Sequence, residues 1–343
     1  MKNLYNTTQL YLSLSIILGL LTNFSSKTLS ATKYTEKDIN AIARMATVIV
    51  SHWGKKDENE KCTAAGLIKD IDDRKRQIRT NQGSGGLIVA EKNNTYYILT
   101  NEHAIPPGAD CYGVVVWDGS KKHETYIIED ANIEYIDRPR YGIDLALIKL
   151  EINSAGKYYI ASLKNSDTIS ESSQLFISGW PKVEEKETST TRRFISVQKI
   201  NNWQTDDVNK CPTNRGYKLC YIGETSGGMS GGPIFDANGY VVGIHGRGDK
   251  DDSKSQLGPQ RAGIPINEFI NLIDSGKSKD LTRDDLNFDP PSSELIAQGK
   301  INTKQADTIE NLYELFLGCF TILQGEAECR KNPSPFAWND RCS

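Results

Sequence analysis

Short apolar runs separated by polar turns fill the chain from Met45 to about residue 246. They are rich in valine, isoleucine, leucine, tyrosine and phenylalanine, and read MATVIV (45–50), GGLIVA (85–90), TYYILT (95–100), YGVVVW (112–117), DLALIKL (144–150), SQLFISGW (173–180), RRFISVQKI (192–200), GGPIFD (231–236) and YVVGIHG (240–246). Clusters of glycine, asparagine and proline divide the runs. Many short strands without helices between them predict an all-β barrel or sandwich rather than a parallel βαβ sheet.

The pattern changes after Ile273. Residues 276–303 are rich in charges and contain the pair Pro290-Pro291, which predicts a linker. Apolar residues then recur at three- and four-residue spacing from Ile309 to Leu323, which predicts an amphipathic helix. We therefore expect one domain over 40–275, followed over 276–343 by a linker and a partly helical C-terminal extension whose role the sequence does not define.

The first thirty-one residues show a third pattern, a single apolar run followed by small residues. Lys2 precedes the apolar run LYLSLSIILGLL (10–21), and small residues follow up to Ser30-Ala31. This run is too short to span about 30 Å of hydrocarbon comfortably. It predicts a signal peptide over 1–31 and a secreted or periplasmic protein, with an uncleaved anchor as the alternative. Since no other segment is apolar enough, we expect no stable membrane insertion.

Charge and cysteine content narrow the function classes. The 343 residues hold 41 Lys+Arg against 44 Asp+Glu, a net charge of −3 with mixed signs, so no basic stripe indicates a nucleic-acid partner. None of the 7 cysteines has the Cys-x-x-Cys spacing of a zinc site, and we expect neither metal nor cofactor. In an exported chain we expect disulfides, with local pairing of Cys211 with Cys220 and of Cys319 with Cys329. The odd number leaves one thiol free or bridged elsewhere, and the oligomeric state stays open.

Glycines surround one serine in the segment GGMSGGP (227–233). A nucleophilic serine needs small neighbours, because the backbone must approach the substrate carbonyl closely and adopt unusual dihedral angles. It also needs backbone N–H groups aimed at the developing oxyanion. Ser230 meets both needs, although a glycine-rich hairpin with an incidental serine is the alternative for this segment alone.

A base and an orienting carboxylate are available at the ends of two predicted strands. Among the 4 histidines, His103 follows the strand-like run 95–100 after two residues, which places its imidazole at the mouth of a strand. Asp144 opens the run DLALIKL, whereas Asp137 lies in a loop with proline and arginine and is the weaker candidate.

Taken together, the chain resembles the trypsin/chymotrypsin-fold serine peptidases, especially their bacterial trypsin-like branch. The resemblance rests on GSGGLIV (83–89), LTNEHA (99–104), DLALIKL (144–150) and GGMSGGPIFDANGYVVGIHG (227–246), in that order. It implies two packed six-stranded antiparallel β-barrels with the site in the cleft between them. It also implies a polypeptide substrate. The Gly-x-Ser-x-Gly spacing at Ser230 also fits an α/β-hydrolase, but that fold needs the acid and the histidine after the serine.

The resemblance assigns a role to each matching residue. Ser230 attacks the scissile carbonyl, His103 carries the proton, and Asp144 holds the imidazole. The N–H groups of Gly228 and Ser230 form the oxyanion hole. The edge Gly246-Arg247-Gly248 pairs with the substrate backbone as an added strand.

Residues before and after the serine set the expected specificity. Thr225 and His245 match the pattern of the glutamyl endopeptidases, in which a hydroxyl and a charged imidazole receive a substrate carboxylate. Glu224 opposes this, since its carboxylate attracts a basic side chain unless it pairs instead with Arg247. We predict an endopeptidase with a preference for acidic residues on the acyl side of the cleaved bond. A pocket for basic or small apolar residues is the alternative. For the whole chain, a catalytically inactive binding module or a membrane-anchored protein remains the competing function class.

Overall fold

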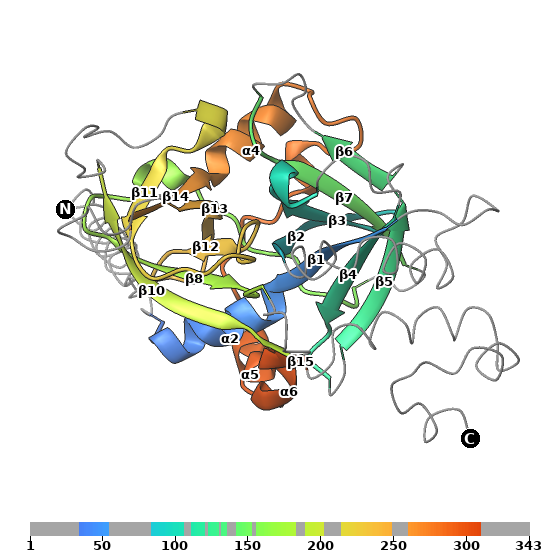
Figure 1. The fold of residues 1–343 in the computed structure, drawn as a ribbon, viewed down its shortest axis with the longest axis horizontal. Helices are drawn as coiled ribbons and strands as arrows, with labels where there is room; N and C mark the ends of the chain where they lie inside the picture. The colour runs from blue at the N-terminus through green and yellow to red at the C-terminus, as the bar shows by residue number, and fades with distance from the viewer. Residues whose placement is uncertain are drawn as a thin grey trace, which may run out of the picture. The chain divides into compact units, whose positions relative to one another are not determined.

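The computed structural model describes residues 34–54, 84–105, 111–120, 123–129, 132–135, 142–152, 156–182, 189–201, 214–248 and 260–309. The predicted signal peptide, Cys211 and the predicted helix beyond Ile309 lie outside these ranges. Figure 1 shows the described part as two groups of strands with helices packed around them.

The first element is a helix that the apolar runs did not predict. Helix α2 (Glu36–Ala46) begins at a capping box, in which the Thr35 side chain accepts from the Asp38 amide and Asp38 accepts from Thr35. Its inward face carries Ile39, Ile42 and Ala46, all almost fully buried. The predicted strand over 45–50 therefore starts only at Thr47, where the helix has ended.

The first sheet has seven antiparallel strands in the order β5-β4-β1-β2-β3-β7-β6. They are β1 (Thr47–Gly54), β2 (Ser84–Lys92), β3 (Thr95–Thr100), β4 (Cys111–Trp117), β5 (His123–Glu129), β6 (Ile133–Tyr135) and β7 (Ala146–Glu151). A six-stranded barrel was expected here. Instead, β5 pairs with β4 alone and the three-residue β6 pairs with β7 alone within the described residues, so the two outer strands do not join.

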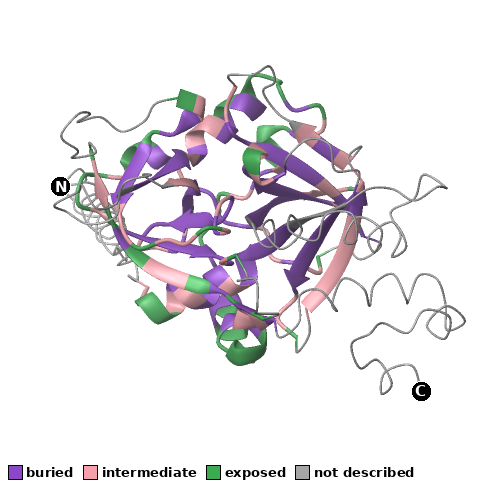
Figure 2. Ribbon diagram, in the orientation of Figure 1, coloured by how far each residue is buried: buried purple, intermediate pink, exposed green. Residues whose placement is uncertain are grey.

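The second group of strands closes into a barrel in the order β10-β11-β14-β13-β12-β8, as predicted. Its strands are β8 (Gln174–Gly179), β10 (Arg193–Ile200), β11 (Leu219–Ile222), β12 (Pro233–Phe235), β13 (Val241–Gly248) and β14 (Gln260–Pro265). The all-β, chymotrypsin-like fold class is confirmed. Figure 2 shows most strand residues buried, and exposed residues on the outward side of the helices and along β10.

The two groups of strands touch closely where β2 begins. The Gly85 N–H donates to the Ser230 carbonyl at 2.6 Å. A Cβ at Gly85 would lie 2.4 Å from the Gly232 nitrogen, so only glycine permits this approach. The contact places the predicted nucleophile directly against the first sheet.

The segment expected to be a linker packs onto the rest of the fold. After α4 (Ile266–Asp274), the chain forms two short helices, α5 (Ser293–Gly299) and α6 (Thr303–Asp307). Leu281, Leu286, Leu295 and Ile296 join the same buried core as α2. The prediction of a linker was wrong, because its apolar residues are spaced among charges and prolines and give no periodic signal.

The C-terminal end of the described chain is a strand. Ile309, predicted to begin a helix, lies instead in β15 (Thr308–Ile309), which pairs with β9 (Thr190–Thr191). None of the helices in the described ranges combines the length and apolarity needed to cross a membrane.

Candidate active site

Two neighbouring strands of the first sheet bring the predicted base and carboxylate together. His103 lies in a 3-10 turn (Glu102–Ala104) just after β3, and Asp144 lies just before β7. Because Thr100 at the end of β3 pairs with Ala146 at the start of β7, the two loops leave the same edge of the sheet.

The contact between them is bidentate. The His103 Nδ1 lies 2.7 Å from Asp144 Oδ2, and the His103 backbone N–H donates to Oδ1 at 2.9 Å. The His103 side chain is 38% exposed and that of Asp144 only 2%. Burial acts to raise the pKa of Asp144, but hydrogen bonds and the charge of His103 outweigh it and hold that pKa below its ordinary value. Asp144 is therefore ionised at neutral pH.

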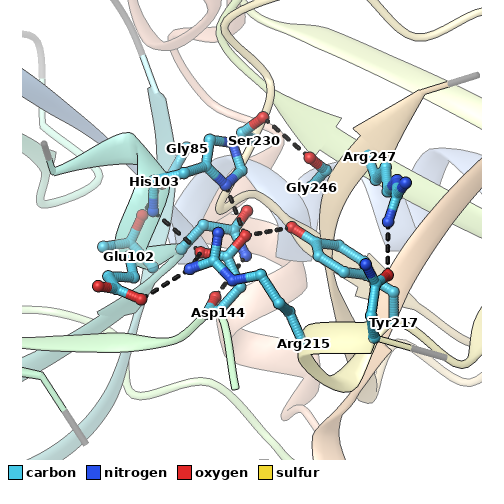
Figure 3. Close-up of polar contacts among 12 residues, drawn as sticks. Gly85, Glu102, His103, Asp144, Arg215, Tyr217, Ser230, Gly246 and Arg247 are labelled. Carbon is cyan, nitrogen blue, oxygen red and sulfur yellow. Dashed lines mark hydrogen bonds and ion pairs between the residues drawn. The ribbon is translucent and has the colours of Figure 1, made fainter. Parts of the chain in front are cut away.

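The predicted nucleophile lies on the turn between β11 and β12. Gly228 and Gly231 flank it with φ of 90° and 84°, a region that favours glycine. In the view of Figure 3 the His103 ring lies between Asp144 and Ser230. Within the described residues, Ser230 Oγ donates to the Gly246 carbonyl at 3.5 Å and makes no hydrogen bond to His103. Catalytic hydrogen bonds of this kind are often absent or poorly aligned in proteins without substrate.

The peptide before Gly228 has a fixed orientation. The Gly227 carbonyl accepts a hydrogen bond from the Lys182 N–H at 2.8 Å, and the Met229 N–H donates to Ser226 at 3.2 Å. Carbonyl and N–H of one trans peptide point in opposite directions. The Gly228 N–H therefore points away from Lys182. In the described part of the chain, neither this N–H nor that of Ser230 has an acceptor.

A polar cluster is buried beside the nucleophile, within the barrel. Tyr221 and His245 are almost fully buried, and the Tyr221 hydroxyl contacts His245 Nδ1 at 2.5 Å. Arg261 is 8% exposed, and its Nε donates to Thr225 Oγ1 at 2.9 Å. Thr225 and His245 were predicted from the sequence, whereas Arg261 and Tyr221 were not.

The imidazole of His245 is neutral, and in this the expectation of a charged group was wrong. Desolvation by burial, followed by the positive charge of Arg261, lowers its pKa to about 3. With Nδ1 facing the Tyr221 hydroxyl, Nε2 has no partner among the described residues. A Tyr221 O–H that donates to Nδ1 places the ring proton on Nε2.

The other predicted binding residues are spread along β13 and the turn. Glu224 is exposed. Its suggested partner Arg247 donates instead to Asn214 Oδ1 at 2.6 Å and stacks over the Tyr217 ring. Gly246 and Gly248 continue β13, which pairs with β14.

Two further residues contact Asp144 without having been anticipated. Arg215 Nη2 lies 3.0 Å from Oδ1, and the Tyr217 hydroxyl donates to Oδ2 at 2.5 Å. Both come from the loop before β11, where no motif marks them. Across the described ranges, no group of histidine, cysteine, aspartate and glutamate side chains is arranged to hold a metal ion.

Comparison with known proteins supports the fold and the enzyme class. Residues 83–244 match the trypsin-like peptidase domain. No curated protein matches the chain significantly. The prediction of a serine peptidase, a hydrolase of peptide bonds, is confirmed by the domain match.

Several solved structures are distantly similar. A variant of the HtrA-type protease AlgW with a decapeptide is 17% identical with a TM-score of 0.48, and the match covers 73% of this chain and 68% of that one. The same variant with a tripeptide is 16% identical with a TM-score of 0.46, covering 71% and 64%. Deg5 is 16% identical with a TM-score of 0.42, covering 69% and 91%. The present chain thus spans just under two thirds of the tripeptide-bound protein. At such identities the likeness says nothing about what this chain cleaves.

Proposed function

We propose that the protein is an exported serine endopeptidase that acts through Ser230, His103 and Asp144 and prefers acidic residues on the acyl side of the cleaved bond. The observation that supports this most is the bidentate contact of Asp144 with His103, next to a serine held in a glycine-rich turn. No cofactor is needed for this chemistry.

Each residue has one step in the proposed reaction. Asp144 accepts the Nδ1 proton of His103 in a hydrogen bond, which leaves Nε2 as the base for the Ser230 hydroxyl. The serine oxygen bonds to the carbonyl carbon while Nε2 takes its proton, and the imidazolium then protonates the leaving amine. Water then attacks the acyl-enzyme while His103 Nε2 takes its proton. The proton passes to the Ser230 oxygen as the acid product leaves.

The N–H groups of Gly228 and Ser230 stabilise the oxyanion in both halves of this reaction. The Lys182–Gly227 hydrogen bond fixes the orientation of the Gly228 N–H before substrate arrives. Losing one such donor typically costs roughly 10²–10³-fold in turnover.

Arg261 is the main support for an acidic preference. Its buried guanidinium lies against Thr225, and its charge acts on His245. A substrate carboxylate near this cluster gains charge-assisted hydrogen bonds worth about 1.5–3 kcal/mol each. Since Glu224 is exposed, its opposing charge is screened by water.

Matched peptides that differ only at the residue before the cleaved bond test the specificity. We expect the glutamate peptide to be cleaved with kcat/KM about 10–100-fold above that of the arginine and alanine peptides, since one charged hydrogen bond supplies such a factor. Arg261→Gln should reduce the glutamate-to-alanine ratio, with Lys199→Gln, which removes a surface charge from β10 of the same barrel, as the control. A preference for arginine would show that Glu224 dominates instead.

A fluorophosphonate probe separates the peptidase from a binding module that has lost turnover. The wild-type protein should be labelled at Ser230, and Ser230→Ala should lose both labelling and roughly 10⁵–10⁶-fold of the turnover with an unchanged unfolding midpoint. A folded protein that resists the probe and leaves every peptide intact is a binding module.

A further inference from the structure

Asp144 forms hydrogen bonds with His103 and also with Arg215 and Tyr217. The proposed mechanism uses only the contact with His103. Oδ1 accepts from the His103 N–H at 2.9 Å and from Arg215 Nη2 at 3.0 Å, while Oδ2 faces His103 Nδ1 at 2.7 Å and the Tyr217 hydroxyl at 2.5 Å. The carboxylate is almost fully buried. Figure 3 shows the Arg215 guanidinium between Asp144 and Glu102, and the Tyr217 hydroxyl reaching Asp144 from the other side.

The segment from Asn214 to Tyr217 is shaped for this contact. Arg215 and Gly216 have φ of 56° and 85°, and a Cβ at Gly216 would lie 2.9 Å from the Ile143 side chain. The Arg215 carbonyl accepts from the Asp144 N–H at 3.0 Å. The left-handed backbone thus lets both the main chain and the side chain of Arg215 hold the same aspartate.

Gly246 explains why the tyrosine hydroxyl fits. A Cβ at Gly246 would lie 2.5 Å from the Tyr217 hydroxyl and 2.5 Å from Asn101 Oδ1. Strand β13 therefore offers no side chain to Asp144 at this point, and Tyr217 takes the space. Desolvation by burial and then the negative charge of Asp144 raise the pKa of Tyr217 well above its ordinary value, so it remains a proton donor.

We propose, resting on the function proposed above, that Arg215 and Tyr217 are positioning residues of the peptidase, and that the charge of Arg215 sets the lower pH limit of its activity. Tyr217 and Arg215 together fix the rotamer of Asp144, which in turn fixes the His103 ring. The positive charge of Arg215 offsets part of the Asp144 charge, so that the protonated imidazole is stabilised less.

The charged groups around His103 determine in which direction the acid limb of the pH profile moves when the Arg215 charge is lost. Asp144 favours the imidazolium, and Glu102 on the same turn favours it too, but Arg215 contacts both carboxylates, at 3.0 Å and 2.7 Å. His245 is neutral and adds no charge at neutral pH. Removing the Arg215 charge therefore leaves two carboxylates less compensated, and the base is protonated at higher pH. Because the Arg215 side chain is 37% exposed, water screens part of this effect.

The test is the pH profile of kcat/KM for the best-cleaved peptide, with Arg215→Met and Arg215→Lys as a matched pair. We expect Arg215→Met to move the acid limb up by about half a pH unit to one unit, and Arg215→Lys to leave it near the wild-type position, since lysine keeps the charge. Tyr217→Phe should lower kcat roughly tenfold with little change in KM, since it removes one hydrogen bond to the orienting carboxylate.

Fluorophosphonate labelling and unfolding midpoints of each variant show whether the fold and the serine survive. If Arg215→Met unfolds, Arg215→Gln, which keeps an N–H donor without charge, gives the same comparison. An acid limb that coincides in all variants, or that moves equally in Arg215→Lys and in Arg215→Met, overturns the inference while wild-type activity still stands. A wild-type protein that cleaves nothing overturns the proposed function, and the inference with it.

Discussion

Two histidines other than His103, the buried His245 and the half-buried His123, make the stability of the protein dependent on pH. Desolvation by burial lowers the pKa of His123 to about 4, although a hydrogen bond to the Ala306 backbone and the nearby Asp307 and Asp118 act against it. Burial likewise lowers the pKa of His245 to about 3. His123 packs edge-on against Trp180, and its Nε2 has no hydrogen-bond partner among the residues that the structure describes. Both rings are therefore neutral in the folded protein.

The free energy of unfolding should fall as the pH drops below 6.5. In the unfolded chain both histidines take up protons near 6.5, the ordinary value, whereas in the folded protein they resist down to about 4 and 3. Their contribution is complete above pH 6.5 and declines down to the folded values. Urea unfolding at several pH values should show a shallower decline for His123→Gln, by roughly 3 kcal/mol between pH 7 and 4. Parallel curves for the two proteins contradict this.

Among the elements, the short C-terminal helix α6 carries a carboxylate that joins it to two arginines from other elements. Asp307 accepts from Arg44 on α2 at 2.9 Å and from Arg192, beside β10, at 2.7 Å. The Arg192 side chain is 1% exposed, and it also donates to Ser178 and Asn40. Loss of this carboxylate leaves a buried guanidinium without its counter-charge.

We expect Asp307→Asn to lower the free energy of unfolding by roughly 3 kcal/mol, the lower end for breaking a buried pair, since Asp307 is partly exposed. Lys300→Gln is the matched control, because it breaks an exposed pair between the end of α5 and Asp38 of α2 and should cost under about 1 kcal/mol. Thermal or urea unfolding measures both. Equal losses would mean that the Arg192 network contributes no more than a surface ion pair.

The helices and strands also show which elements can be predicted from the sequence and which cannot. Strands such as β3 and β13 were predicted because each is a continuous apolar run bounded by turns. Strand β5 was missed because its sequence HETYIIE carries four charged or titratable side chains and only Ile128 of its residues is fully buried. Helix α2 was missed despite the cap at Thr35 and Asp38, because its last residues continue into an apolar strand.

The candidate site, too, can be predicted only where a residue stands in a recognisable local pattern. His103, Asp144 and Ser230 stand next to recognisable strands and glycines, so their surroundings identify them. Arg215, Tyr217 and Arg261 carry no such local mark, because their roles depend on contacts between distant strands. Cys220 is disulfide-bonded, and its predicted partner Cys211 lies outside the described residues, so that pairing stays a prediction.

At the scale of the whole molecule, the predicted signal peptide implies that residues 1–31 are removed on export. We expect mass spectrometry of exported protein to find a mature N-terminus near Ala31 and no peptide from residues 1–25. Disulfide bonds at Cys111 and Cys220 suit an oxidising compartment. Recovery of an intact Met1 from a membrane fraction would indicate the uncleaved anchor.

The hydrogen bond from Gly85 to Ser230 joins the first sheet to the barrel, and the proposed active site needs residues from both. The proposed base and its carboxylate lie at the ends of strands of the first sheet, the proposed nucleophile lies in a turn of the barrel, and the Gly85 N–H holds the Ser230 carbonyl across the junction. Under the proposed mechanism, a partly synthesised or half-folded chain therefore has no complete triad. Since N-terminal regions of a chain fold first as it emerges, we expect peptidase activity to appear only after the barrel has closed.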